Sequence, residues 1–483
     1  MKKNFYITTT LPYVNAEPHV GFAMEIIRAD VIARAKKLQG YEVFFNTGTD
    51  EHGQKLFDAA AKEDKDVQAY VDAYAEKFRG LKDLLGISDD VHFIRTTDEH
   101  HLRAAQEFWK RCKENGYIYK KTYQSKYCVG CELNKTDSEL DEQGECPIHP
   151  GRALELIDEE NYFFKFSAFQ QPLLDVYEKN PSFVIPDFRF NEIKSFVSSG
   201  LEDFSISRLK SKMSWGVPVP DDAEHVMYVW FDALVNYIST LGWPENNENF
   251  EKFWIHGTPT QYCGKDNLRQ QSAMWQAMLL AAGLPNSQQI IINGFITGEG
   301  GIKMSKSIGN VINPYDVVAE YGTEALRFFL LSEVSSFEDS PFTLERFKES
   351  YNAKLANGLG NLTSRIMKMA ETNLEQAVEI PDMTLTEDWA PALVAMENFN
   401  IQEAMTLVFQ HVTELDELIQ KKEPFKLVKT DSVAAKEIIK DLVIKLHNIG
   451  QMLAPALPET SRKMMAIAKS NKKPEEALFL RKD

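Results

Sequence analysis

Hydrophobic and polar positions in the first 115 residues alternate between short strand-like runs and longer helical patterns. The run Phe5–Thr10 is rich in Tyr, Ile and Thr, which favours a buried strand. After a loop, Pro18 is expected to start a helix that runs to about Gln39 and stops at Gly40. The same patterns predict strands at 41–49 and 92–95 and helices at about 53–62, 67–85 and 98–115. This alternation is typical of a parallel sheet built from βαβ units.

The pattern changes near residue 116 and again near residue 321. Residues 117–224 are rich in aromatic and charged residues and in short strand-like runs, as expected of an insertion. The sheet is expected to resume after Val226, with strands at Phe253–His256 and Ile290–Thr297. The predicted fold class is therefore α/β with an inserted module and an all-α C-terminal bundle. The predicted boundaries are 1–115 and 225–320 for the two halves of the α/β domain, 116–224 for the insertion, 321–342 for a linker and 343–483 for the bundle.

The first strand–loop–helix unit predicts an anion-binding site. The unpaired N–H groups at the start of its helix face the space above the sheet edge, where they attract phosphate oxygens. At the start of this helix, the His19 ring offers a hydrogen-bond donor, and Gly21 lets a ligand approach the backbone. Taken alone, His-x-Gly is equally compatible with an ordinary helix start. The Gly-x-Gly-x-x-Gly fingerprint is missing after the first strand, which removes the main reason to expect a dehydrogenase.

Two further stretches carry candidate substrate-binding residues. Asp50 follows the second strand, at the edge where open α/β sheets bind ligands. It can pair with a substrate ammonium group or cap the next helix. In the apolar stretch 228–237, Trp230 and Tyr237 lie seven residues apart on one helical face. These rings are compatible with core packing and with the wall of a pocket for an apolar side chain.

A loop with glycine hinges follows the last predicted strand. Gly298-Glu299-Gly300-Gly301 precedes Lys303-Met304-Ser305-Lys306-Ser307. Two lysines three residues apart on a mobile loop can close over a triphosphate and neutralise the charge that develops on the leaving pyrophosphate. The alternative is an ordinary polar loop that binds no ligand.

The insertion contains four metal-ligating residues with the spacing of a zinc site. Cys128 and Cys131 form one pair, and Cys146 and His149 form a second pair 14 residues further on. This spacing lets two tight turns place three thiolates and one imidazole around a tetrahedral Zn²⁺. Because four protein ligands close the coordination shell, the zinc is expected to be structural.

Composition narrows the possible binding partners and the cellular location of the protein. The net charge of -17 argues against bulk, non-specific nucleic-acid binding, although local basic patches can still hold RNA. The candidate patches are Arg208–Lys212, the lysines at 421, 422, 426 and 429, and Arg462-Lys463. No signal peptide and no membrane-spanning apolar run is found in the sequence, and five cysteines in this length argue for a reducing compartment. A cytoplasmic location without a membrane partner is therefore expected.

The segments around His19 and Lys303 resemble the paired signatures of class I aminoacyl-tRNA synthetases, His-Ile-Gly-His and Lys-Met-Ser-Lys-Ser. The whole chain resembles the bacterial-type methionyl-tRNA synthetase family, whose modules occur in the same order. The resemblance implies a Rossmann-like catalytic domain, a zinc-knuckle connective insertion, a stem-contact linker and an anticodon-binding bundle.

The resemblance also implies roles for individual residues. The implied methionine-binding residues are Leu11, Tyr13, Asp50, Trp230, Ala233, Tyr237 and Gln271, with Asp50 holding the ammonium group. The implied ATP-binding residues are His19, Gly21, Glu25, Asp266, Lys303, Ser305 and Lys306, of which His19, Gly21, Lys303 and Lys306 are catalytic. The implied anticodon-binding residues are Asn361, Arg365 and Phe425.

The activity implied by the resemblance is that of a methionine–tRNA ligase. The methionine carboxylate attacks the α-phosphate of ATP in line, which gives methionyl-adenylate and pyrophosphate. A ribose hydroxyl of the terminal adenosine of the tRNA then takes the methionyl group, and class I relatives use the 2′-hydroxyl. The expected partners are ATP with Mg²⁺, L-methionine, and initiator and elongator tRNA(Met), with one structural Zn²⁺ per chain. The chain is expected to be a monomer.

Three positions depart from the family pattern. Phe22 occupies the place of the second signature His, and a phenyl ring cannot donate to phosphate, so slower adenylation is expected. Gln271 occupies the place of a pocket His of many relatives. Phe425 replaces a Trp that stacks on an anticodon base, and its stacking should be weaker.

Two other functions are compatible with parts of this pattern. A tRNA-independent adenylyltransferase would use the same His-x-Gly turn, but it leaves the zinc insertion and the helical tail without a role. A degenerate synthetase that only binds RNA would explain Phe22, but it leaves the loop lysines and the pocket residues unexplained.

Overall fold

The computed structural model describes residues 3–482 except 16, 129–132, 136–139, 142, 148–150, 152–153, 303, 305–310 and 381–388, and only the backbone at 123–128, 133–135 and 155–158. A parallel sheet of six strands lies at the centre of this part of the chain, as the sequence predicts. In spatial order its strands are β3 (His92–Arg95), β2 (Glu42–Thr49), β1 (Asn4–Thr9), β11 (Thr258–Gly264), β12 (Gln289–Asn293) and β7 (Val184–Ile185).

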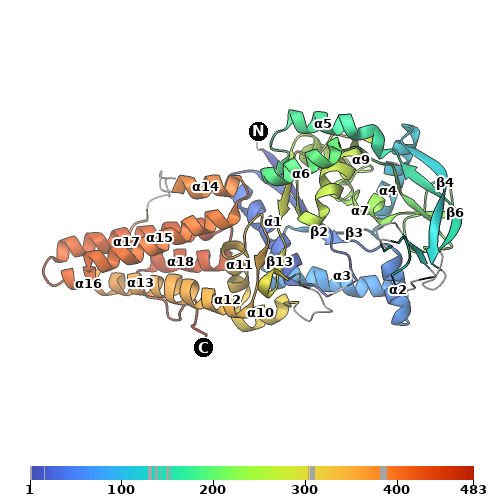
Figure 1. The fold of residues 1–483 in the computed structure, drawn as a ribbon. Coiled ribbons are helices and arrows are strands. Elements are labelled where there is room, and N and C mark those ends of the chain that lie inside the picture. Colours follow the sequence, from blue (N-terminus) through green and yellow to red (C-terminus); the bar gives the residue numbers. More distant parts are fainter. Residues whose placement is uncertain are drawn as a thin grey trace.

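Helices join these strands and cover the sheet (Figure 1). Helix α1 (Val20–Leu38) connects β1 to β2, and 12 of its 19 residues are buried, including the charged Arg28 and Asp30. The connection from β2 to β3 carries α2 (Gln54–Lys62) and α3 (Val67–Leu84), and α4 (Glu99–Glu114) follows β3. The second half of the sheet region contains α7 (Val229–Ala233), α8 (Asn236–Ser239), η3 (Phe250–Ile255), η4 (Lys265–Asn267), η5 (Gln270–Met274) and α9 (Trp275–Ala281).

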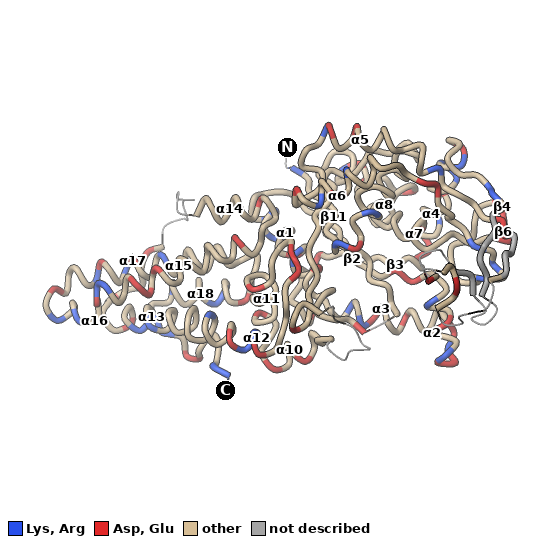
Figure 2. Tube along the Cα trace, in the orientation of Figure 1, with Lys and Arg blue, Asp and Glu red and all other residues tan. Residues whose placement is uncertain are grey.

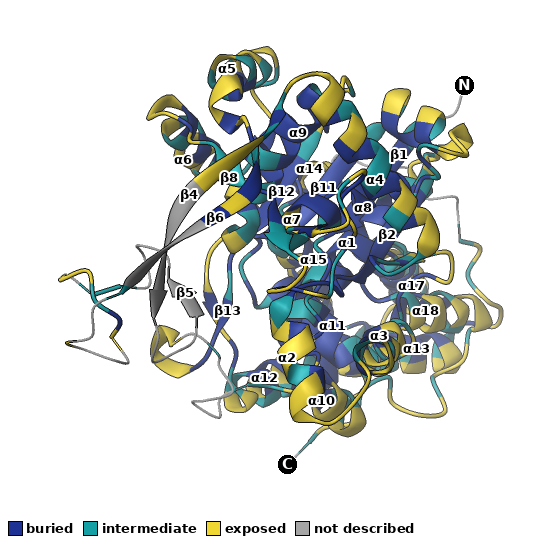
Figure 3. Ribbon diagram, turned by 90° about the vertical axis from the view of Figure 1, so that its right-hand side faces the viewer, coloured by how far each residue is buried: buried dark blue, intermediate teal, exposed yellow. Residues whose placement is uncertain are grey.

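The segment between the two halves forms a long antiparallel ribbon. Strand β4 (Ile118–Cys128) pairs with β6 (Glu155–Phe164), and the ribbon reaches away from the central sheet (Figures 1 and 3). The short strands beside the ribbon are β5 (Leu133–Lys135), β8 (Phe204–Ser205), β9 (Ser207–Leu209) and β10 (His225–Met227), and the helices are η2 (Phe166–Phe169), α5 (Gln170–Lys179) and α6 (Asp187–Ser198).

The C-terminal part forms a helical bundle that extends to one side of the sheet (Figure 1). A short connection carries β13 (Ile296–Thr297), η6 (Glu299–Gly301), α10 (Pro314–Tyr321), α11 (Thr323–Ser332) and β14 (Ser340–Pro341). The bundle itself contains α12 (Leu344–Ser350), η7 (Tyr351–Gly360), α13 (Asn361–Asn373), α14 (Ala390–Glu397), α15 (Ile401–Lys422), α16 (Pro424–Leu427), α17 (Ser432–Leu453) and α18 (Pro458–Ser470). Among the described helices, none combines the length and the apolar character that crossing a bilayer requires.

One predicted strand is wrong. The run Phe253–His256 was expected to be a strand, but residues Phe250–Ile255 form the π-helical turn η3, and the strand β11 begins at Thr258. The run carries aromatic residues that suit a strand and a buried helical turn equally well, and a short apolar run does not distinguish the two. Phe250, Phe253 and Trp254 all pack into the core beside the sheet.

Buried charges join α1 to the bundle. The carboxylate of Asp30 accepts from Arg327 on α11 at 2.9 Å, and both side chains are completely buried. Arg327 also donates to the carbonyl oxygens of Leu85 at 3.0 Å and Ala456 at 2.8 Å. Burial by itself would raise the pKa of Asp30, but the charges of Arg327 and Arg34 lower it below its usual value. Asp30 is therefore ionised, and its partner Arg327 joins α1 to the Ala456 carbonyl of the bundle.

The Asp30–Arg327 pair generates a stability prediction. Asp30→Asn leaves the buried guanidinium without its counter-charge, so the free energy of unfolding should fall by about 3–5 kcal/mol. Arg34→Gln is the control, because Arg34 bonds the same carboxylate at 2.8 Å but is 23% exposed, and its loss should cost less than about 1 kcal/mol. Urea denaturation followed by circular dichroism measures both, and equal costs would contradict the prediction.

Candidate active site

The candidate site lies at the carboxyl ends of β1, β2 and β11. Strand β1 pairs in parallel with β2 on one side and with β11 on the other. The chain leaves β1 toward β2, and the second half of the sheet lies on the opposite side, so a topological switch point falls beside β1. Open α/β sheets bind their ligands in the crevice above such a point.

His19 forms the start of the helix that faces this crevice. Its Nδ1 accepts from the N–H of Gly21 at 3.0 Å, which caps α1. The ring stacks on Phe22 with the centroids 4.2 Å apart, and Phe22 meets Phe78 edge-on at 5.5 Å. A Cβ at position 21 would lie only 2.8 Å from His19 Cε1, so glycine is needed there for the His19 ring to keep its place.

The Lys-Met-Ser-Lys-Ser loop ends beside the same helix start. Lys303, Ser305 and Lys306 lie outside the described residues, so their predicted roles stay predictions. The chain before them is turned by a hydrogen bond from the Gly298 N–H to the Ile302 carbonyl at 2.7 Å. The chain after them returns to α1, where the Val20 N–H donates to the Ile312 carbonyl at 3.2 Å. The chain directly after the second signature segment therefore lies beside the start of α1.

Two predicted ATP-binding acids lie across the junction of β1 and β11. Glu25 on α1 accepts from the Thr10 N–H at 2.7 Å, directly after β1. Burial raises the pKa of Glu25 to about 8, and the negative charge of Asp266 contributes to this rise. Asp266 follows β11, and its Oδ1 would lie 2.7 Å from a Cβ at Gly264, so this glycine leaves room for the carboxylate.

Asp50 occupies the position predicted for a partner of an ammonium group. Its backbone is bridged to the loop after β1 by hydrogen bonds with Pro12 at 3.0 Å and Val14 at 3.3 Å. The carboxylate is 9% exposed, and its Oδ1 has no hydrogen-bond partner among the described residues. Burial, with the nearby charge of Asp232, raises the pKa of Asp50 well above its usual value. A cation in the crevice would satisfy this carboxylate.

The other predicted pocket residues differ in how far they are buried. Leu11, Tyr237 and Gln271 are buried, Tyr13 and Ala233 are half-buried, and Trp230 is 43% exposed. Tyr13 interacts with both Asp50 and Asp232, whose charges raise the pKa of its phenol after the effect of burial. Gln271 donates from Nε2 to the Tyr237 hydroxyl at 2.5 Å, so these two predicted residues are in direct contact.

Sequence reasoning missed an acid–imidazole cluster behind Asp50. The buried Asp232 lies 3.1 Å from Nδ1 of His52 and 4.0 Å from Nε2 of His101. Burial lowers the pKa of His101 to about 3, so that its imidazole is neutral. Burial raises the pKa of Asp232, and His52 opposes that rise. The available signal was a single aspartate inside the apolar stretch 228–237.

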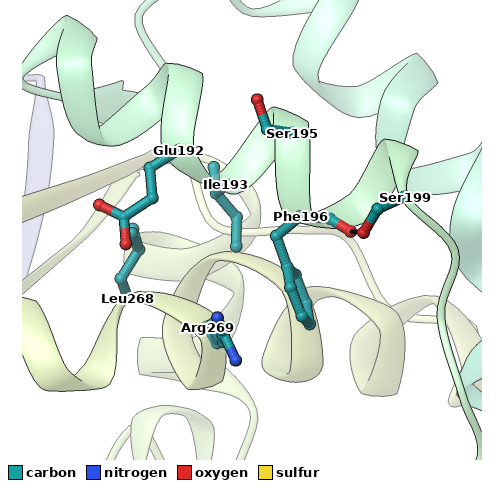
Figure 4. Close-up of a pocket in the computed structure, with 7 residues that line it drawn as sticks. All are labelled: Glu192, Ile193, Ser195, Phe196, Ser199, Leu268 and Arg269. Carbon is teal, nitrogen blue, oxygen red and sulfur yellow. Dashed lines mark hydrogen bonds between the residues drawn. The ribbon is translucent and has the colours of Figure 1, made fainter.

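A neighbouring pocket of about 320 Å³ lies between α6 and the turn that follows Asp266 (Figure 4). Its Arg269 guanidinium lies 4.4 Å from the centre of the Phe196 ring and so forms part of the wall. The lining residues are Glu192, Ile193, Ser195, Phe196, Ser199, Leu268 and Arg269. None of the predicted site residues lines this pocket.

The predicted anticodon residues lie on the bundle, away from the sheet edge. Asn361 is exposed at the start of α13, and Arg365 on the same helix forms an ion pair with Asp416 of α15. Phe425 lies on α16 at the end of the bundle and is 49% exposed (Figure 1). All three residues lie on helices of the bundle, outside the sheet whose edge forms the crevice.

The predicted zinc ligands fall mostly outside the described side chains. Cys131 and His149 are outside the described residues, and Cys128 is described only by its backbone. Cys146 is buried and directly follows a tight turn, in which Asp141 Oδ1 accepts from the N–H groups of Gln143 at 3.0 Å and Glu145 at 2.8 Å. Within the described residues, no three His, Cys, Asp or Glu side chains are grouped to hold a metal ion.

Comparisons with known proteins agree with this fold. The family model described as tRNA synthetases class I (M) matches residues 5–154 and 150–367, which defines the class. The methionine–tRNA ligase of Thermotoga maritima is 39% identical and covers 97% of this chain and 76% of its own. That of Thermosynechococcus vestitus is 41% identical and covers 95% and 89%. The structure of Mycobacterium tuberculosis methionyl-tRNA synthetase in complex with methionyl-adenylate superposes with a TM-score of 0.84 at 35% identity, covering 96% of this chain and 93% of that chain. The chain belongs to the methionine–tRNA ligase family.

The raised pKa of Glu25 generates a pH prediction. Between its ordinary pKa of 4.5 and about 8, the folded chain holds a proton here that the unfolded chain has lost. Folding stability should therefore fall as the pH rises through this window, by at most about 1.4 kcal/mol per pH unit for this group. In Glu25→Gln this group no longer titrates. The free energy of unfolding of the variant, relative to that of the unsubstituted chain, should therefore rise from pH 5 to pH 8. Denaturation midpoints at each pH measure this, and a parallel pH dependence of the two proteins would contradict it.

Proposed function

We propose that this chain activates methionine with ATP in the crevice above β1, β2 and β11 and then transfers it to tRNA(Met). The observation that carries the proposal is the buried Asp50 carboxylate, which follows β2 at the carboxyl edge of the sheet and has one oxygen without a partner among the described residues. It supplies the counter-charge for an amino-acid ammonium group at the sheet edge where α1 begins, and an ATP phosphate can reach this helix N-terminus.

The methionine would lie with its ammonium group on Asp50. Leu11 and Tyr237 offer apolar, buried surface for its side chain, and Tyr13, Trp230, Ala233 and Gln271 would complete the wall. Aromatic rings suit a thioether because sulfur makes favourable contacts with their edges. The substrate carboxylate would then point toward the helix start at His19.

The ATP would lie between His19 and the Lys-Met-Ser-Lys-Ser loop. A methionine carboxylate oxygen attacks the α-phosphorus while the bond to pyrophosphate breaks, so no protein nucleophile is needed. His19, Gly21 and the α1 N–H groups would hold the phosphates, and Lys303, Ser305 and Lys306 would neutralise the leaving pyrophosphate. Mg²⁺ bound with ATP supplies further charge neutralisation. Glu25 and Asp266 would bind the nucleoside side of ATP.

The bundle would hold the anticodon of initiator and elongator tRNA(Met). Arg365 and Asn361 offer a guanidinium and an amide that can read base edges, and the exposed Phe425 ring offers a stacking surface. Lysines gather around α16 at the same end of the bundle, in an otherwise acidic chain (Figure 2). These positive charges favour the approach of RNA to that end.

The remaining features of the proposal concern the whole molecule. A structural Zn²⁺ would be held by Cys128, Cys131, Cys146 and His149, and the buried position of Cys146 after a tight turn suits a zinc knuckle. The zinc would fix the fold of the ribbon and take no part in the reaction. We further propose that the chain acts as a cytoplasmic monomer, with the catalytic domain at 1–115 and 225–320, the insertion at 116–224, the linker at 321–342 and the bundle at 343–483.

Two assays on the full chain test this function and separate the two proposed sites. Methionine-dependent exchange of labelled pyrophosphate into ATP reports activation, and charging of tRNA(Met) reports both steps. Arg365→Ala should lower kcat/KM for charging roughly 5- to 150-fold, the cost of losing one base-reading arginine, and leave exchange unchanged. The control is Lys440→Ala, an exposed lysine of α17 paired with Glu437, which should change neither. A chain without methionine-dependent exchange would refute the function.

Phe22 generates a second prediction for the same exchange assay. Its ring stacks on His19 but offers no donor to the phosphates. Phe22→His places a ring N–H beside them and should raise the exchange rate, by up to roughly 10²-fold. The preference among amino acids should not change, because position 22 lies on the nucleotide side. Phe22→Leu is the control without a donor and should give no gain. An unchanged or slower rate in Phe22→His would contradict the prediction.

A further inference from the structure

Two buried carboxylates lie close together at the edge of the sheet. Asp50 directly follows β2, and Asp232 lies on the short helix α7. Burial raises the pKa of Asp50 well above its usual value, and the neighbouring charge of Asp232 raises it further. Because burial and a like charge both disfavour ionisation, such a pair of carboxylates readily holds one proton between its two members.

The surroundings of Asp232 favour its charged form. Its Oδ2 lies 3.1 Å from Nδ1 of His52, and its Oδ1 lies 4.0 Å from Nε2 of His101. Burial raises the pKa of Asp232, but His52 opposes that rise. Burial lowers the pKa of His101 to about 3, so its imidazole is neutral, and its Nδ1 lies 2.9 Å from the Ser239 hydroxyl. His52 is therefore the group that stabilises the ionised form of Asp232.

The surroundings of Asp50 disfavour its charged form. The charges that act on it, those of Asp232 and Glu51, are both negative. Arg95 balances the charge of Glu51 through two hydrogen bonds at 2.8 and 2.7 Å, so Asp232 remains the main source of repulsion. The main-chain N–H of His52 favours ionised Asp50, but Oδ1 of Asp50 is buried without a hydrogen-bond partner among the described residues. Of the two carboxylates, Asp50 is the one that takes the proton.

Two phenols also face Asp50. Burial raises the pKa of both Tyr13 and Tyr228, and the charge of Asp50 adds to the rise, so both phenols stay neutral. The Arg208 guanidinium lies over the Tyr228 ring, 4.5 Å from its centre, and lowers the pKa of that phenol. Neither phenol exchanges a proton near neutral pH, so the titration at this place belongs to Asp50.

We propose that Asp232 and His52 are positioning residues that keep a proton on Asp50 until methionine binds, and that the methionine ammonium group expels this proton. This inference rests on the proposed function, because it requires the ammonium group to lie on Asp50. The Asp50 O–H bond breaks, its proton passes to the solvent, and the remaining carboxylate pairs with the ammonium group, which keeps its own protons. The protonated form avoids a buried charge without a counter-ion before the substrate arrives.

The first test counts the released protons in the full chain. Methionine is titrated calorimetrically in two buffers of equal pH and different ionisation enthalpy, and the difference in heat gives the protons released per methionine bound. The number should approach about one at the low end of the pH range in which methionine binds, and it should fall as the pH rises. Methionine binding without proton release throughout this range would overturn the proposal. A chain that neither binds methionine nor supports pyrophosphate exchange would instead overturn the function.

The second test uses variants at the pH where the unsubstituted chain releases about half a proton. Asp232→Asn removes the repelling charge, so Asp50 is already ionised in more molecules and the number should fall roughly 2- to 5-fold. His52→Gln should lower it as well, because the proton can then move to Asp232 and stay there. His101→Gln is the matched control, since it removes a neutral imidazole beside the same carboxylate and should leave the number unchanged. An unchanged number in Asp232→Asn, or an equal fall in His101→Gln, would contradict the assigned roles.

The same proton should appear in the kinetics of pyrophosphate exchange. With saturating ATP, kcat/KM for methionine should fall toward low pH, because protonated Asp50 does not pair with an ammonium group. Asp232→Asn should raise this parameter at low pH roughly 2- to 5-fold, relative to its value at high pH. The pH profile of kcat/KM for ATP, measured with saturating methionine, should not change in this variant. Equal changes in both profiles would show a general structural effect and refute the proposed role of Asp232.

Discussion

The fixed position of helix α1 is the constraint on which the rest of the structure depends. Its first residues face the crevice, and its middle is held by charge. Arg28 donates to the carbonyls of Leu330, Val334 and Ser335 at 2.8–3.1 Å, and Asp30 pairs with Arg327. Because buried charges tolerate little misplacement, the helix cannot slide along its axis without losing these bonds. The site and the bundle therefore share one reference element.

The crevice contains a polar atom that the protein leaves unsatisfied. Oδ1 of Asp50 is buried without a hydrogen-bond partner among the described residues. Such an atom costs stability in an empty site, because water no longer solvates it. A substrate group that pairs with it recovers this cost on binding. Behind the crevice the opposite holds, since the buried side chains of Gln261, Gln271, Gln276 and Ser287 are joined by hydrogen bonds.

The sequence predicted the alternating strands and helices of the first half well, because their periodicities are local. It also predicted that His19, Asp50 and Glu25 lie near the sheet edge, from motif and resemblance. It missed η3, because an aromatic run suits two kinds of structure. It also missed the Asp232 cluster and the hydrogen bonds among Gln261, Gln276 and Ser287. Gln261 and Ser287, for example, are 26 residues apart in sequence, and no local pattern records a contact that the fold alone creates.

The buried ion pair between Asp30 and Arg327 limits how the bundle can move relative to the sheet. Helix α15 contains 22 residues and so spans about 33 Å from the junction toward the free end of the bundle. A rotation of about 3° at the junction would swing that end by about 2 Å, which is enough to break a hydrogen bond. The hydrogen bonds that Arg28 and Arg327 make at this junction therefore limit how far the free end of the bundle can swing relative to the sheet.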